Sequence, residues 1–324
     1  MPEVIGHHHT KGLLRAAFLI VTKEWNGMAK LSRTRTALLI AFLVLIWGIN
    51  WPLSKIALSY TPPVLFSGMR TLLGGLLLLV VALPRYKQLR FKETWPMYVL
   101  SSLLNIILYY GLQTIGLNYM PAGLFAAIVF LQPVLVGLFS WLWMGEAMNG
   151  LKFTGLILGF SGVAVISVGG MSGHISAIGI WLAVGSALSW ALGTLYVKKI
   201  GGSVDPIWLV TVQLIIGGML MTALGTEVES WSSVVWSAPF IACLLFISIF
   251  VITAGWLVFY HLIGAGEASE VASYTFLIPL IAILISTLFL HEPFTLYLLA
   301  GLILIVISIY LVNRKPRKAA VGAA

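Results

Sequence analysis

The chain has 324 residues, of which 60% are hydrophobic and 9% are charged, and its formal net charge is +9. Its mean hydropathy is +1.02. So few polar side chains cannot cover the surface of a water-soluble globule of this length, and the single cysteine, Cys243, excludes an intrachain disulfide. The composition indicates an integral membrane protein.

The first 27 residues do not follow the pattern of the rest of the chain. The three histidines His7 to His9 are adjacent and cannot all face one metal ion from a helix. Met28 directly precedes the basic flank of the first apolar span, as a natural start would. We interpret residues 1–35 as an N-terminal leader and cytoplasmic segment with the native start at Met28; a tag remnant is the alternative explanation of the histidines.

Ten apolar stretches then follow one another, each about the length of 20 residues that a helix needs to cross a bilayer. The loops between them are too short to hold a soluble domain. The stretches are residues 36–59, 62–83, 96–117, 122–144, 152–170, 176–197, 206–225, 237–262, 269–290 and 294–312. The sequence therefore predicts an all-α integral membrane protein with ten transmembrane helices, followed by a cytoplasmic tail at 313–324.

The chain repeats itself. The segment WGINWPLSKI, which begins at Trp47, returns as WALGTLYVKK, which begins at Trp190, and Glu146 answers to Glu292. The repeat predicts two units of five helices, at 36–170 and 176–312. Because five is an odd number, the second unit must enter the membrane from the opposite side. Inverted repeats are typical of carriers that work by alternating access, with the substrate bound near the midplane.

The distribution of basic residues predicts the orientation of the chain in the membrane. If the first helix starts in the cytoplasm, the basic residues of the flanks and loops fall on the inside, at 30–35, 85–92, 152, 198–199 and 314–318. This bias places both termini in the cytoplasm. The net positive charge then reflects contact with anionic lipid headgroups, and it implies no nucleic-acid partner.

Several motifs, taken in order, are similar to those of one family. The first unit has Trp47-Gly48, Arg70 with Gly74-Gly75, and Leu131-Gln132-Pro133 leading to Gly145-Glu146; the second has Pro279, Glu292 and Gly301. Over residues 36–312 the chain resembles two EamA domains of the drug/metabolite transporter superfamily. The resemblance implies a ten-helix carrier of the inner membrane that exports small metabolites or amino acids, and it leaves the substrate open.

Candidate site residues are polar and aromatic side chains at membrane depth, which are costly in lipid and usually face a cavity or a partner. In the first span Trp47, Asn50 and Trp51 share one helical face. This face either lines a substrate cavity or packs against a neighbouring helix. In the second span Arg70 lies deep in the hydrocarbon. It either binds a substrate carboxylate, which its planar fork suits, or ties down helix ends.

Further candidates occur in both units. Tyr109 and Gln113 share a face of the third span, and Gln132 has Ile278 as its repeat counterpart, an asymmetry expected of substrate contacts. Aromatic residues of the second unit would complete the wall: Trp190, Trp256, Tyr260 and Tyr274. Together these residues predict a substrate-binding site between the two units.

The residues and motifs that the sequence lacks disfavour several classes of function. No Asp or Glu lies in the middle of a predicted span, which disfavours exchange of lipophilic cations and favours a zwitterionic, anionic or neutral substrate. No metal-ligand spacing, paired aspartates or phosphate loop occurs, so we expect no enzyme activity, cofactor or metal. We therefore expect a monomeric or homodimeric secondary transporter of a small molecule. The alternatives are a membrane sensor or assembly subunit without flux, and an exporter of neutral compounds.

Overall fold

The computed structural model describes residues 32–116, 128–168, 176–281 and 296–314, together with the single positions 119, 125 and 285. Residues 1–31 of the predicted N-terminal segment, including Met28, lie outside the described residues, whereas its last residues, from Ser32, lead into α2. Every regular element within them is helical. The helices of the first half are α2 (Arg33–Ala57), α3 (Pro63–Ala82), α4 (Phe91–Ser102), α5 (Tyr109–Gly116), α7 (Gln132–Met144) and α8 (Gly150–Val168). Those of the second half are α9 (Ala177–Ile200), α10 (Pro206–Val228), α11 (Ala238–Phe246), α12 (Gly255–Ala265), α13 (Ala268–Ser273) and α15 (Leu296–Asn313).

Six helical stretches in the described part of the chain are long and apolar enough to cross a membrane: Arg33–Ser54, Pro63–Gln88, Phe91–Gly116, Ala177–Ile200, Pro206–Val228 and Ala238–Ala265. Four further apolar helices are shorter within the same residues: Gln132–Met144, Gly150–Val165, Ala268–Ile281 and Leu299–Asn313. The expectation of an all-helical, multi-pass membrane protein is therefore confirmed. The count of ten and the inverted repeat stay predictions.

Two of the long stretches change their winding midway. A π-helical segment, η2 (Leu103–Leu108), joins α4 to α5, and a second one, η4 (Ile247–Ala254), joins α11 to α12. A π segment leaves local backbone groups without their usual partners and often marks a functional position. Segment η4 supplies Val251 to the central cavity, and η2 directly precedes α5, which supplies three of its lining residues.

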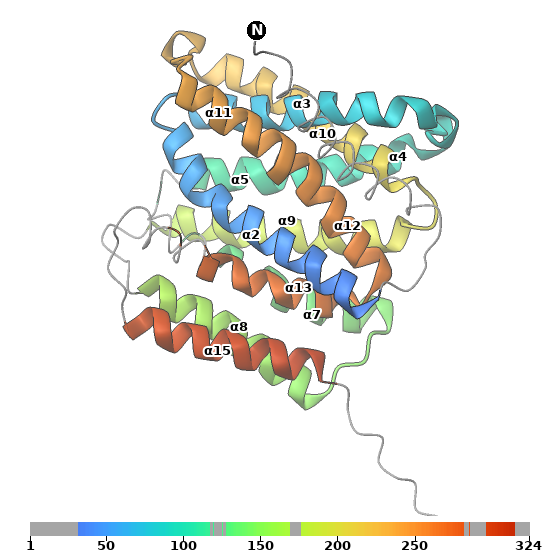
Figure 1. Cartoon of the computed structure of the whole chain (residues 1–324), viewed down its shortest axis with the longest axis vertical. Helices are drawn as coiled ribbons and strands as arrows, with labels where there is room; N and C mark the ends of the chain where they lie inside the picture. Colours follow the sequence, from blue (N-terminus) through green and yellow to red (C-terminus); the bar gives the residue numbers. More distant parts are fainter. Residues whose placement is uncertain are drawn as a thin grey trace, which may run out of the picture.

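Helices α3 and α10 pack closely at one end of the bundle, and α8 and α15 lie side by side at the other (Figure 1). Glycine makes the first contact possible, because a Cβ on Gly68 would lie 2.5 Å from Oγ1 and 2.6 Å from the backbone nitrogen of Thr222. On α10, a Cβ on Gly218 would lie 2.5 Å from the backbone nitrogen of Leu72. Small residues that let backbones approach closely are a common device of helix packing in membranes.

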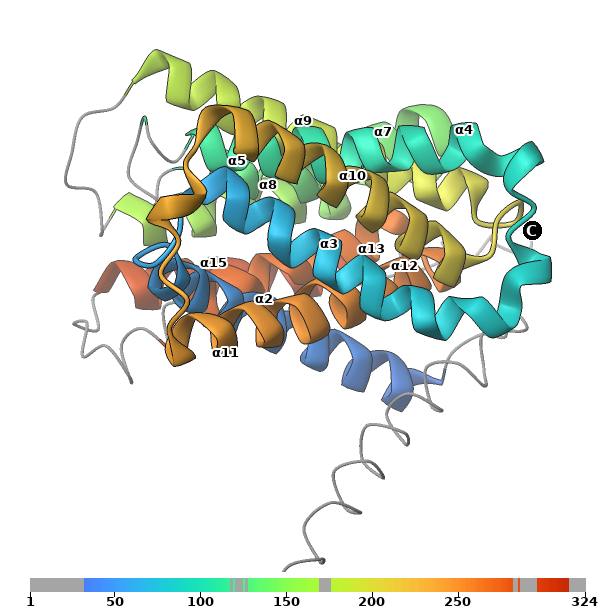
Figure 2. The same cartoon turned by 90° about the horizontal axis from the view of Figure 1, so that it is seen from above.

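The α3–α10 pair is tied at both of its ends. At one end, both carboxylate oxygens of Glu229 accept hydrogen bonds from the first amides of α3, at Val64 (2.9 Å) and Leu65 (2.7 Å). At the other, Arg85 forms an ion pair of 2.8 Å with Asp205, whose side chain also caps α10. The central helices α2, α9 and α12 lie between this pair and the α8–α15 pair (Figure 1), and Figure 2 shows the same helices from above.

Candidate functional site

A small cavity of about 30 Å³ lies at the centre of the bundle. Its lining comes from both halves of the chain. The first half supplies Trp47 and Asn50 of α2, Tyr109, Tyr110 and Gln113 of α5, and Val129 and Phe130 just before α7. The second half supplies Trp190 of α9, Val251 of η4, Trp256 of α12 and Ile278. A cavity of this size holds little more than water, so a larger ligand requires the walls to move apart.

Six of the residues that line the cavity are aromatic: Trp47, Tyr109, Tyr110, Phe130, Trp190 and Trp256. The ring centroid of Trp47 lies 5.8 Å from that of Trp190 and 5.9 Å from that of Trp256, both in edge-to-face contact. Tyr109 lies 5.0 Å from Trp190. Trp47 is fixed in this position because its indole nitrogen donates to the carbonyl oxygen of Val251, at 3.2 Å, in the π segment η4. These rings suit a flat or apolar part of a ligand.

Three polar groups interrupt the aromatic wall. Within the described residues, Gln113 Oε1 and Trp190 Nε1 are buried without a hydrogen-bond partner, one an acceptor and the other a donor. Asn50 is half-buried, and its Oδ1 accepts a hydrogen bond of 3.2 Å from Ser54. Buried polar groups in native proteins are nearly always paired, so these unpaired atoms are suited to receive a polar ligand.

Arg70 lies next to the cavity but does not line it. Its guanidinium carbon is 4.9 Å from the centroid of Tyr110 and 5.1 Å from that of Phe66. The group donates to the hydroxyls of Ser54 (3.3 Å) and Ser67 (3.5 Å). Among the described residues no carboxylate pairs with it. Its charge is therefore held by aromatic faces and hydroxyls, behind the ring of Tyr110.

The remaining predicted site residues lie elsewhere. Gln132 is buried and donates to Thr194 at 3.4 Å, and the hydroxyl of Tyr260 donates to Gln213 at 2.9 Å; both bonds join helices. Tyr274 is half-buried, outside the cavity lining. The side chain of Trp51 lies outside the described part of the chain. Of the predicted residues, the cavity brings together Trp47, Asn50, Tyr109, Gln113, Trp190 and Trp256.

Sequence reasoning missed five lining residues: Tyr110, Val129, Phe130, Val251 and Ile278. Four of them are apolar and look like any other lipid-facing residue in a hydrophobic span. Tyr110 carried a usable signal, because it is a tyrosine adjacent to a candidate. The face predicted from an undistorted helix does not include it, and the π segment just before α5 changes the residues that face inward.

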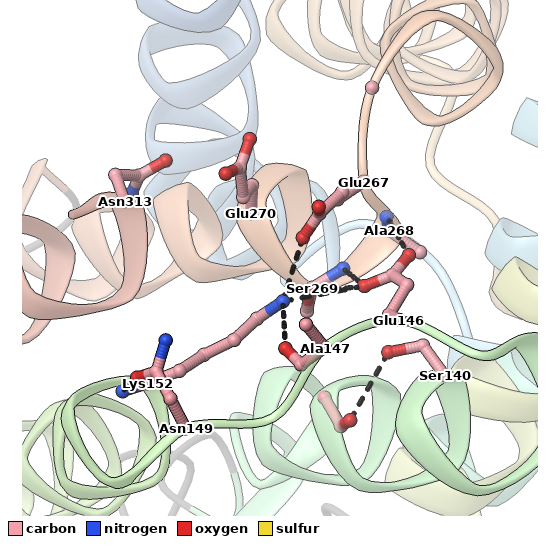
Figure 3. A network of polar contacts seen from close by, with 12 residues as sticks. Ser140, Glu146, Ala147, Asn149, Lys152, Glu267, Ala268, Ser269, Glu270 and Asn313 are labelled. Atoms are coloured by element: carbon pink, nitrogen blue, oxygen red, sulfur yellow. Dashed lines mark hydrogen bonds and ion pairs between the residues drawn. The ribbon is translucent and has the colours of Figure 1, made fainter. Parts of the chain in front are cut away.

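A second polar site lies at the end of the central helices and is built around Glu146 (Figure 3). Gly145 ends α7 in the left-handed conformation, with φ of 70°, which turns the chain and presents the next side chain to α13. There Glu146 accepts hydrogen bonds from the amide of Ala268, at 2.7 Å, and from the hydroxyl of Ser269. A carboxylate at the first amides of a helix neutralises the positive end of its dipole.

Two lysines complete this Glu146 cluster. Lys198, at the end of α9, lies 3.2 Å from Glu146 and also donates to the carbonyl of Gly266. Lys152 of α8 lies 3.6 Å from Glu146 and 2.8 Å from Glu267 (Figure 3). Burial raises the pKa of the Glu146 carboxyl, but the Ser269 hydrogen bond and the Lys198 charge outweigh it and hold the pKa below its ordinary value. The cluster thus joins α7 and α8 to α9 and α13.

We find no group of three or more His, Cys, Asp or Glu side chains placed to hold a metal ion among the described residues. The two sites therefore offer different chemistry. The cavity can enclose an apolar group and pair with a few polar atoms, whereas the Glu146 cluster can hold helix ends together by charge.

Helices of membrane-spanning length around a cavity shared by both halves of the chain define a polytopic membrane protein with an internal cavity. The sequence pattern of the EamA-like transporter family matches residues 34–168 and again residues 177–314. The chain belongs to this family of membrane transporters, as the motifs in the sequence indicated.

Relatives and a solved structure agree with this assignment. The "Uncharacterized transporter YvbV" of Bacillus subtilis is 67% identical over 290 residues, covering 90% of this chain and 95% of that protein. A "Probable amino-acid metabolite efflux pump" of Escherichia coli is 25% identical, covering 86% and 94%. A crystal structure with 18% identity aligns with a TM-score of 0.76 over 87% of this chain and 97% of that one, which shows the same fold.

Proposed function

We propose that the protein is a secondary carrier that exports an amino acid or a related zwitterionic or anionic metabolite across the inner membrane by alternating access. The central cavity is the observation that carries this proposal. It lies between the two halves of the chain, where an inverted-repeat carrier holds its substrate. Its unpaired donor and acceptor groups suit a substrate with both carboxylate and ammonium ends, and its rings suit the rest.

The inverted arrangement of ten helices is part of the proposal, with units at 36–170 and 176–312 and both termini in the cytoplasm. Two observations support it. The family pattern matches once in each half. The π segments η2 and η4 begin at Leu103 and Ile247, which are separated by nearly the same interval as Trp47 and Trp190 of the repeated motif. Equivalent distortions at equivalent positions are expected of duplicated units.

In this arrangement the Glu146 cluster lies at the cytoplasmic face. It joins the ends of α7 and α8, from the first half, to α9 and α13, from the second. Inward opening of the carrier separates α7 and α8 from α9 and α13, so the cluster closes this face and must break before the cavity reaches the cytoplasm. The α3–α10 pair, tied at both ends, is the part that stays together.

The proposed direction and substrate class rest on the name of a relative and on the charge near the cavity. The Escherichia coli relative is named an amino-acid metabolite efflux pump. The cavity lining contains no charged side chain among the described residues, and the nearest charge, on Arg70, is positive. A positive charge behind the wall disfavours a cationic substrate and favours one with a carboxylate.

Counterflow in proteoliposomes tests the proposal. Vesicles containing the purified protein are loaded with one unlabelled amino acid from the set of twenty, and entry of the same labelled amino acid is measured. We expect at least one amino acid to exchange. Asn50→Ala should lower its exchange about tenfold while the melting temperature stays near that of the wild type, because one hydrogen bond to a charged group is lost.

Two other outcomes of the counterflow experiment would each contradict one part of the proposal. Exchange of neutral compounds but of no amino acid would show that the substrate class is wrong. Ligand binding without exchange of any compound would support a sensor in place of a carrier.

A further inference from the structure

Arg70 is connected to the cavity through a chain of two hydrogen bonds. Its Nη1 lies 3.3 Å from the hydroxyl of Ser54, and that hydroxyl lies 3.2 Å from Oδ1 of Asn50. Ser54 and Asn50 are four residues apart on α2, so they share a face of the helix. Asn50 lines the cavity, whereas Arg70 does not.

The donor and the acceptor of each of these hydrogen bonds follow from the groups involved. A guanidinium has only donors, so the Ser54 oxygen must accept from Arg70. The Ser54 proton is then available to donate, and Oδ1 of Asn50 accepts it. An asparagine amide has an accepting oxygen at one end and a donating NH2 group at the other. The hydrogen bonds that run from Arg70 through Ser54 therefore determine which end faces Ser54. The oxygen faces Ser54, and the NH2 group is the end left for the cavity.

Arg70 is positioned by two aromatic rings and two hydroxyls, while its Nε has no hydrogen-bond partner among the described residues. Its guanidinium lies between the rings of Phe66 and Tyr110, at 5.1 and 4.9 Å, and its second terminal nitrogen donates to Ser67. Tyr110 is fixed in turn, because its hydroxyl accepts a hydrogen bond of 3.2 Å from the indole nitrogen of Trp256. A donor with a fixed position and a permanent charge can orient the groups that it contacts.

The NH2 group of Asn50 has no partner among the described residues. No hydrogen bond from it is present there, and Gln113 Oε1, across the same lining, is also unpaired. A donor and an acceptor that face one cavity and lack protein partners match a ligand with an acceptor at one end and a donor at the other.

We propose that Arg70 is a positioning residue that acts through Ser54 to hold the NH2 group of Asn50 toward the cavity, where it donates to the carboxylate of the substrate. Arg70 therefore influences selectivity without touching the substrate. The substrate part of this inference rests on the proposed function, whereas the orientation of Asn50 does not.

The orientation is tested without any ligand, by magnetic resonance of the purified protein in which only the asparagines carry nitrogen-15. The side-chain signal of Asn50 is identified by its loss in Asn50→Asp. We expect Ser54→Ala and Arg70→Lys each to move or broaden this signal, because the chain is broken at one link or the other. Thr71→Ala, which removes a buried hydroxyl of α3 that donates to the carbonyl of Ser67 and does not contact Arg70, should leave it in place. An unchanged signal in Ser54→Ala would overturn the proposal.

Selectivity is tested with the same variants by thermal stabilisation. The probes are the twenty amino acids and, for the one that stabilises the wild type most, its carboxamide. We expect Ser54→Ala to weaken binding of the acid roughly five- to tenfold and to reduce the preference for the acid over the amide. A purely structural Arg70 would lower the melting temperature and leave this preference unchanged, which contradicts the proposal. If no amino acid binds the wild type, the proposed substrate class is wrong. The side-chain signal of Asn50, measured without ligand, then still tests whether Arg70 orients Asn50.

Discussion

Arg70 and Glu146 show two ways in which single charged residues are accommodated in this protein. Arg70 is buried among rings and hydroxyls and has no carboxylate partner among the described residues. Glu146 has only 8% of its side chain exposed, but two lysines and the amide of Ala268 surround it. The first arrangement suits a fixed charge that orients neighbours. The second suits an ion pair that can be broken and formed again, because each charge has more than one partner.

The environment of Glu146 predicts a pH dependence. Its folded-state pKa lies below the ordinary value of 4.5, so ionised Glu146 stabilises the folded protein at pH values above 4.5. This contribution is lost as the pH falls through the folded-state pKa. We expect Glu146→Gln to melt at a lower temperature than the wild type at pH 7, and the difference to shrink below about pH 4.5.

The groups that face Glu146 are Lys198 of α9, Lys152 of α8 and the segment from Gly266 to Ser269, which includes Glu267. The measurement is the melting temperature in detergent as a function of pH. Glu229→Gln is the matched control for helix capping. Glu229 accepts hydrogen bonds from the first amides of α3, and no lysine pairs with it among the described residues. A difference between wild type and Glu146→Gln that is constant from pH 7 to pH 3.5 would contradict this account.

At the scale of the elements, close packing and distorted winding have separate roles. Helices α3 and α10 approach through glycine, and they are tied at both ends. The stretches α4–α5 and α11–α12 carry π segments, and the cavity lies beside them. The glycine contact supports a rigid pair, whereas the π segments supply carbonyl groups such as that of Val251, which holds Trp47.

The glycine contact predicts a difference between two similar substitutions. Gly68→Ala should destabilise the protein by about 1–3 kcal/mol, because its Cβ would meet the backbone of Thr222 and push α3 away from α10. Gly111→Ala, also within a helix, should be neutral or slightly stabilising, since no atom lies within 4 Å of its added Cβ. Thermal unfolding of both variants in the same detergent checks this. Equal loss of stability would show that the close approach is unimportant.

At the scale of the whole molecule, the ties between the two halves differ in their position. Those of the α3–α10 pair occur at both ends, while the Glu146 cluster occurs at one end of the central helices. A carrier needs one part that stays together and another that separates alternately at the two faces. In the proposed carrier mechanism, the positions of these ties favour a rigid role for α3 and α10 and a separating role for the helices that the Glu146 cluster joins.

The proposed topology is tested by cysteine labelling in a Cys243→Ala background. Thr226→Cys, near the end of α10, should react with a membrane-impermeant thiol reagent in sealed cells. Gln88→Cys, in the connection after α3, should react only once the cells are opened; both native side chains are exposed. Reaction of Gln88→Cys in sealed cells would contradict the orientation deduced from the basic residues.

The sequence by itself determined that the protein is an all-helical membrane protein, and it determined the family. These properties depend on composition, on run length and on the order of motifs, all of which are local. It also identified six of the residues that line the cavity, because a polar or aromatic side chain at membrane depth is unusual enough to notice.

The tertiary structure decided which of those residues face the cavity and how they are oriented. Helical periodicity cannot place Arg70 behind Tyr110, because that depends on how α3 packs against α5. Nor can it foresee that Val251 holds Trp47, a contact between residues 204 positions apart whose acceptor lies in a π segment. The Glu146 cluster likewise forms only when four helix ends meet. Apolar residues such as Val129 and Ile278 gain their role from packing alone, since their chemistry is that of the surrounding lipid-facing helices.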